Sequence, residues 1–138
     1  MKTQQIKSKE RVREQGEVFT RPEEVNAMLD LLPEVTIEMT FLEPTCGNGN
    51  FVVKILKRKF DKCKKKADFI TALKSVVAID IMADNVAECK QRALELYKSY
   101  GQKENISFIL DTQIFQGNSL AIMNLLEKDK VNVISWKE

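Results

Sequence analysis

Short apolar runs alternate along this chain with longer segments in which apolar residues recur at helical spacing. The runs at Phe41-Leu42 and Ser75–Ile81 are nearly continuous, as in strands that are buried on both faces of a parallel sheet. Two further short runs, Ile114–Gln116 and Val131–Ile134, predict a third and a fourth strand. The pattern therefore predicts four parallel strands.

The segments between these strands carry helical periodicity. Apolar residues recur every three or four positions from Phe51 to Cys63 and from Val86 to Tyr100, where Gly101 is a natural stop. Shorter helices are predicted over Asp68–Lys74, Asn105–Gln113 and Ala121–Leu126. The second of these fits neither period cleanly, and we interpret it as a short helix packed under the sheet edge.

One more helix is predicted ahead of the first strand. Thr20 can cap it, Pro22 suits its first turn, and Glu23 completes a capping box. Its apolar face is expected to comprise Val25, Met28, Leu29 and Leu32, and Pro33 is expected to end it.

This alternation of strands and helices predicts an α/β fold of the Rossmann-like kind. Right-handed crossovers give a partial parallel sheet of order 3-2-1-4 with helices on both faces. With 138 residues, 43% of them apolar, the chain has the size of one domain. We expect residues 1–15 to form a polar arm or helix and residues 16–138 to form the domain.

The charge and the cysteine content narrow the classes of protein to which this chain can belong. A net charge of +2 gives no global attraction for nucleic acid. Two basic stretches, the N-terminal arm and the helix from Lys54 to Lys66, are interpreted first as solvated faces and second as nucleic-acid contacts.

Cys46, Cys63 and Cys89 form no C-x-x-C pair, so no metal site is expected. No apolar run approaches the roughly 18 residues of a membrane span, and we expect a cytoplasmic protein with no membrane contact.

Candidate chemistry begins in the loop after Phe41-Leu42-Glu43. Gly47 and Gly49 let the backbone turn sharply and approach a bound molecule, at the carboxyl end of a strand where open sheets place ligands. The third glycine of a dinucleotide fingerprint is absent, because Val52 stands in its place. The loop therefore predicts a cofactor other than a dinucleotide.

Other polar residues follow strand ends at the same edge. Asp80 is placed to accept hydrogen bonds from the hydroxyls of a ribose, with Ile81 against a base. Asn118 can recognise an adenine amino group, and the helix N-terminus at Asn50 can hold a carboxylate. Ribose, adenine and carboxylate together describe S-adenosyl-L-methionine.

These motifs resemble those of the N6-adenine DNA methyltransferases of restriction-modification systems, in the order X, I, II, III. Gly16-Glu17-Val18-Phe19-Thr20 is similar to motif X and Leu42–Phe51 to motif I. Ala78–Ile81 is similar to motif II, and Gly117-Asn118-Ser119-Leu120 to motif III, which usually carries Asp where this chain has Asn118. The resemblance implies a methyltransferase fold that binds S-adenosyl-L-methionine and acts on DNA.

The resemblance also implies roles for single residues. Thr20 and Glu43 would contact the methionine part, and Cys46 and Gly47 would line it with backbone. Asp80 and Ile81 would hold ribose and adenine. The full set of implied cofactor-binding residues is Phe19, Thr20, Glu43, Pro44, Cys46, Gly47, Gly49, Asn50, Asp80, Ile81, Asn118 and Ser119.

The catalytic motif of that family, an Asp, Asn or Ser followed by Pro-Pro and an aromatic residue, is missing from this sequence. The prolines are Pro22, Pro33 and Pro44, none adjacent, so we expect no catalytic residue and no methyl transfer by this chain alone. The alternatives are half of an enzyme completed by a partner chain, and a non-enzymatic protein that engages restriction-modification subunits. We also expect a homodimer through an exposed fourth strand with Val131, Val133 and Ile134.

Overall fold

The computed structural model describes residues 5–15, 19–118 and 132–133. In chain order its elements are α1 (Lys9–Gln15), α2 (Pro22–Leu29), β1 (Phe41–Glu43), α3 (Asn50–Phe60), α4 (Lys66–Lys74), β2 (Val76–Asp80), α5 (Ala83–Ser99), α6 (Ser107–Gln113), β3 (Ile114–Gln116) and β4 (Asn132–Val133). The predicted α/β class is confirmed. The predicted short helix before the third strand is confirmed as α6, whereas the predicted helix over 121–126 lies outside the described residues.

The strands pair in parallel in the order β3-β2-β1-β4. Phe41 of β1 lies opposite Val76 of β2 on one side and Asn132 of β4 on the other, and Asp80 of β2 lies opposite Gln116 of β3. Of the predicted fourth strand, Val131 and Ile134 lie outside the described residues. Association of two chains through the β4 edge stays a prediction.

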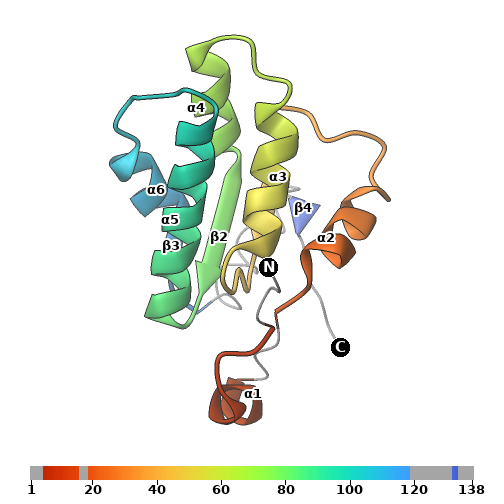
Figure 1. Ribbon diagram of the computed structural model, residues 1–138, viewed down its shortest axis with the longest axis vertical. Helices are drawn as coiled ribbons and strands as arrows, with labels where there is room; N and C mark the ends of the chain where they lie inside the picture. Colours follow the sequence, from red (N-terminus) through yellow and green to blue (C-terminus); the bar gives the residue numbers. More distant parts are fainter. Residues whose placement is uncertain (1–4, 16–18, 119–131, 134–138) are drawn as a thin grey trace.

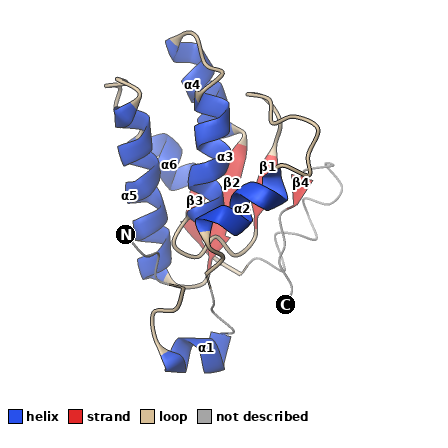
Figure 2. Ribbon diagram, turned by 45° about the vertical axis from the view of Figure 1, so that its right-hand side comes forward, coloured by secondary structure: helices blue, strands red, loops and turns tan. Residues whose placement is uncertain are grey.

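Helices α2, α3 and α5 lie side by side over one face of the sheet (Figures 1 and 2). Fully buried aliphatic residues fill the space beneath them, among them Val25, Ile55 and Ala78. At one end of α3, four rings pack at centroid distances of 5.1 to 6.3 Å; these are Phe60, Phe69, Tyr97 and Tyr100. None of the described helices combines the length and apolarity needed to cross a bilayer.

The first predicted helix differs from α2 at both ends. Arg21 is the N-cap, and no side chain caps the helix. The capping box expected at Thr20 is wrong, because Pro22 takes the first helical position and keeps the residue before it extended. The helix also ends at Leu29 rather than near Pro33. The Asp30 amide still bonds the carbonyl of Asn26 four residues back, whereas the amides of Leu31 and Leu32 bond three residues back, to Met28 and Leu29, and close the turn.

Lys59 is buried, contrary to its assignment to the solvated faces of the basic helix. Its side chain is fully enclosed, and its Nζ donates to the backbone carbonyls of Thr36, Ile37 and Met39 at 2.7, 3.0 and 2.5 Å. The ammonium also lies 5.2 Å from the centroid of the Phe41 ring. Three carbonyls match the three donors of a lysine, so this cation fastens the segment before β1 to α3.

Candidate functional site

Three chain segments meet where β1, β2 and β3 end. The Cys46 amide donates to the carbonyl of Ile79 at 2.8 Å, which holds the loop after β1 against β2. The Gly117 amide donates to the carbonyl of Asp80 at 3.1 Å, which holds the residues after β3 against the same strand. The structure therefore brings together the glycine loop, Asp80 and the segment that leads to Asn118.

Asp80 is the centre of this edge and accepts three hydrogen bonds from described residues. Its Oδ2 accepts from the Gly47 amide at 2.9 Å, and its Oδ1 accepts from the Met82 amide at 2.8 Å and the Asn85 side chain at 3.2 Å. A carboxylate offers about four acceptor positions. Among the described residues, these contacts leave one acceptor position on Oδ2 for a further donor.

The two loop glycines have the backbone that the sequence analysis expected. Gly47 and Gly49 have φ of +53° and +95°, a region that other residues rarely adopt. Both are also closely covered: a Cβ at Gly47 would lie 2.8 Å from the ring of Phe19, and one at Gly49 would lie 3.1 Å from the sulfur of Cys89. The covering residues come from the segment before α2 and from α5.

Glu43 lies at the end of β1 and is completely buried. Its Oε1 accepts from the Thr45 amide at 3.0 Å, while its Oε2 has no hydrogen-bond partner among the described residues. Burial raises the pKa of Glu43 well above its ordinary value. A buried carboxyl oxygen without a partner is costly, and a cationic donor at this point would stabilise it.

Cys46 is a buried free thiol. A hydrogen bond with Cys89 raises the pKa of the Cys46 thiol, and burial raises it further. A thiol must ionise to act as a nucleophile. Burial and the raised pKa therefore do not favour a thiolate at Cys46, and its part in cofactor binding stays a prediction.

Asn50 begins α3 and is almost fully buried, at 4% exposure. Its Nδ2 donates to the carbonyl of Thr20 at 2.5 Å, and its Oδ1 accepts from Arg92 at 2.8 Å. Arg92 was missed by the sequence analysis. The available signal was its place on α5 at helical spacing from Asn85 and Cys89, which also face the loop.

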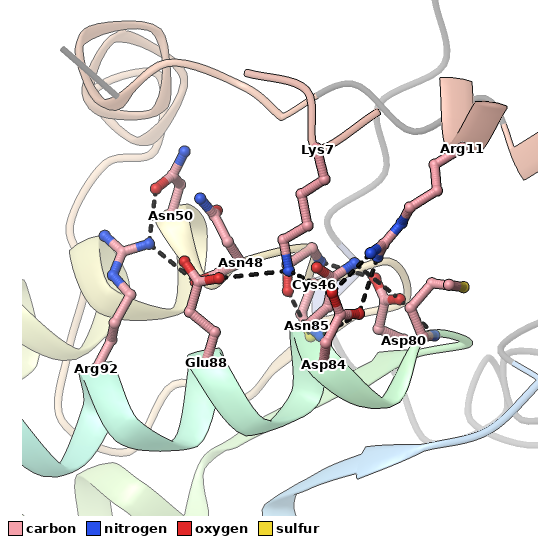
Figure 3. A network of polar contacts seen from close by, with 12 residues as sticks. Lys7, Arg11, Cys46, Asn48, Asn50, Asp80, Asp84, Asn85, Glu88 and Arg92 are labelled. Carbon is pink, nitrogen blue, oxygen red and sulfur yellow. Dashed lines mark hydrogen bonds and ion pairs between the residues drawn. The ribbon is translucent and has the colours of Figure 1, made fainter. Parts of the chain in front are cut away.

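The N-terminal segment also reaches this edge, from the opposite end of the sequence (Figure 3). Arg11 bonds both carboxylate oxygens of Asp84, at 2.6 and 2.9 Å, and Lys7 lies 3.0 Å from Asp84 and 3.3 Å from Glu88. The backbone of Gln5 accepts from the Phe19 amide at 2.6 Å. The expectation of a solvated arm is therefore wrong for Lys7 and Arg11, because two acids on α5 attract them.

The basic faces of α3 and of the turn after it are neutralised in part by acids. Arg58 lies 2.7 Å from Asp30, and Lys62 lies 2.7 Å from Glu34. Lys66 at the start of α4 lies 2.8 Å from Glu104. These pairs lower the local positive charge, so they favour the interpretation as a solvated face over phosphate contact.

The remaining predicted residues differ in exposure. Pro44 is buried, whereas Ile81, at 56% exposure, and Asn118 face outward. An exposed aliphatic side chain beside Asp80 is available to a ligand. Ser119 lies outside the described residues, as do residues 16–18 of the motif that ends in Phe19 and Thr20.

Comparison with known proteins shows that part of this chain is related to a methyltransferase. A stretch of 47 residues, 33% of the chain, is 45% identical to the type II methyltransferase M.VspI of Vibrio sp. (strain 343). The matched stretch spans 12% of that protein's length. No family model matches the chain, and no solved structure matches it.

Proposed function

We propose that this chain binds S-adenosyl-L-methionine at the edge where β1, β2 and β3 end. The observation that carries the proposal is the bond between the Gly47 amide and the Asp80 carboxylate, which joins a glycine loop to an acidic strand end. Ligands of parallel α/β sheets bind at this edge. The similarity to a methyltransferase over 47 residues supports this particular cofactor.

The residues present fit the chemical groups of that cofactor. The Oε2 of Glu43, which has no partner among the described residues, suits the cofactor's ammonium group, and the remaining acceptor position on Asp80 suits a ribose hydroxyl. Ile81 offers an exposed apolar surface for the adenine ring. Asn118 would accept from the adenine amino group through its side-chain carbonyl, as a neutral substitute for an aspartate.

The wider assignment follows the motif order. We propose a methyltransferase-type Rossmann fold related to the N6-adenine DNA methyltransferases, with DNA and restriction-modification subunits as partner classes. When bound, the cofactor would supply an activated methyl group. The 138 residues do not contain the Pro-Pro acceptor motif that positions a flipped adenine. We therefore expect this chain alone to transfer no methyl group to DNA.

Calorimetric titration with S-adenosylhomocysteine, the demethylated product, tests the proposal. Ile81→Ala should weaken binding about tenfold, because burying the lost methylene groups contributes about 1–2 kcal/mol. Leu31→Ala is the matched control, since Leu31 is also an exposed aliphatic residue, at 85% exposure, in the turn after α2. Folded parent protein that binds no S-adenosylhomocysteine at millimolar concentration would contradict the proposal.

A further inference from the structure

One face of α5 forms the support of the glycine loop. Asn85, Cys89 and Arg92 follow one another at steps of four and three residues, so they share a side of the helix. Cys89 packs against Gly49. Asn85 bonds Asp80 at 3.2 Å, and Arg92 donates to the loop at the carbonyl of Asn48 (Figure 3). Each turn of α5 thus fixes a different part of the site.

Arg92 makes two contacts through one nitrogen. Its Nη1 donates to the backbone carbonyl of Asn48 at 2.9 Å and to the side-chain Oδ1 of Asn50 at 2.8 Å. The first contact holds the loop backbone. The second decides which way the Asn50 amide faces, because only an oxygen can accept from a guanidinium.

The orientation of Asn50 has a consequence on its other side. With Oδ1 directed at Arg92, Nδ2 is directed at the carbonyl of Thr20 and donates to it at 2.5 Å. Asn50 is 4% exposed, so its side chain is largely shielded from bulk water. Arg92, Asn50 and Thr20 therefore form a chain of contacts from α5 to the segment ahead of α2.

We infer that Arg92 is a positioning residue that sets the Asn50 amide and thereby places the Thr20 segment at the amino-acid end of the cofactor site. The inference rests on the proposed function. The contacts of Arg92 with described residues are to Asn48 and Asn50, so its proposed role is exerted through Asn50 rather than on the cofactor. Loss of the guanidinium frees the amide to turn, which leaves the Thr20 carbonyl without its donor and the segment unanchored.

Two ligands separate this role from a general loss of structure. S-adenosylhomocysteine carries the amino-acid end, and 5′-methylthioadenosine lacks it. Arg92→Met should weaken the binding of S-adenosylhomocysteine about tenfold, which is the effect of one lost charge-assisted bond. The affinity for 5′-methylthioadenosine should change less than about twofold. Arg92→Lys keeps a cation without the planar fork and should restore part of the loss.

The control is Arg58→Met. Arg58 also donates from a helix to a backbone carbonyl and a side-chain oxygen, those of Asn26 and Asp30, at 3.1 and 2.7 Å. These partners belong to α2 and its C-cap rather than to the glycine loop. Arg58→Met should therefore leave the affinities for both ligands unchanged.

Nuclear magnetic resonance of the ligand-free protein supplies an independent readout. Arg92→Met should shift the side-chain amide signals of Asn50 and the backbone signals of Thr20 and Arg21, while Arg58→Met leaves them in place. Unchanged Asn50 signals, or equal weakening of both ligands, would overturn the inference. If the parent protein binds neither ligand, the proposed function fails, and the role of Arg92 at a cofactor site fails with it. The shifts of the Asn50 signals still report whether Arg92 orients this amide.

Discussion

The backbone amide of Gly47 lies 2.9 Å from the Oδ2 of Asp80, so the loop after β1 is bonded directly to the end of β2. Asp80 also accepts from Met82 and Asn85, and a carboxamide in its place has one accepting oxygen fewer. We expect Asp80→Asn to lower the free energy of unfolding by about 1.5–3 kcal/mol, measured by urea denaturation, because bonds to a charged acceptor are lost.

Asp61→Asn is the control for this change. Asp61 is exposed and caps α3 at the end opposite the glycine loop. Its substitution should alter the free energy of unfolding by less than about 1 kcal/mol. Equal effects of the two substitutions would show that Asp80 does not join the strand ends.

Alanine substitutions at two glycines separate the cost of backbone strain from the cost of overpacking at the glycine loop. Gly49 and Gly101 both have positive φ, of +95° and +77°, but only a Cβ at Gly49 would crowd a neighbour, Cys89. Gly101→Ala should cost about 1 kcal/mol of stability from backbone strain, and Gly49→Ala about 1–3 kcal/mol more from overpacking. Thermal or urea unfolding measures both, and equal costs would argue against tight packing of the loop on α5.

The N-terminal segment is held to α5 by charge. Hydrogen bonding to Arg11 and then to Lys7 lowers the pKa of Asp84 from its ordinary value of 3.8. Because the folded pKa is the lower one, the stabilisation is complete above pH 3.8 and is lost as the pH falls toward the folded value. Asp84 is 52% exposed, so we expect Asp84→Asn to cost less than about 1 kcal/mol.

The same substitution should release the segment locally at neutral pH. The Phe19 amide, bonded to the carbonyl of Gln5, should exchange its hydrogen several-fold faster in Asp84→Asn. Asp111→Asn is the matched control, because Asp111 also forms an exposed ion pair with α5, 2.9 Å from Lys90. Unchanged Phe19 exchange would show that the Asp84 pairs do not hold the segment.

Lys59 gives a prediction with a definite sign. Burial lowers the pKa of Lys59 from 10.5 to about 8. Between these values the unfolded chain keeps a proton that the folded chain has released, so this residue makes the protein more stable as the pH rises from about 8 toward 10.5. At pH 7, Lys59→Met should still destabilise by about 1–3 kcal/mol, because buried carbonyls lose their donor.

The measurement is the difference in unfolding free energy between the parent and Lys59→Met at several pH values. This difference should grow in favour of the parent between pH 8 and pH 10. Lys62→Met, at a partly exposed lysine paired with Glu34, should show no such growth. A difference that stays flat across this range would contradict the burial of a titrating lysine.

The hydrophobic pattern predicted most elements because it records which faces are buried. The nearly continuous apolar run Ser75–Ile81 indicated β2, which is buried on both faces, and the helical period from Val86 to Tyr100 indicated α5, which buries one face. The positions of Gly47 and Asp80 at strand ends followed from the parallel order. Long-range polar pairing carries no such period, so the contacts of Arg92 with Asn50 could not be predicted.

Lys59 and Arg11 show that the local sequence also fails to predict the partners of charged residues. A lysine within a basic run is predicted to be exposed to solvent. Lys59 instead donates to three backbone carbonyls that are distant in sequence and is buried among them. Arg11 reads as part of a free basic arm, yet its partner Asp84 lies 73 residues away. Local sequence gives the charge of a residue, whereas its partner depends on the folded chain.

The central claim is that S-adenosyl-L-methionine binds where β1, β2 and β3 end. The most direct test is a titration of isotope-labelled parent protein with S-adenosylhomocysteine, followed by nuclear magnetic resonance of the backbone amides. The account predicts the largest shifts at Gly47, Gly49, Ile81 and Asn118, with little change at Asp61 and Gly101 away from this edge. Saturable binding with its shifts elsewhere, or no shift in the folded protein, would contradict it.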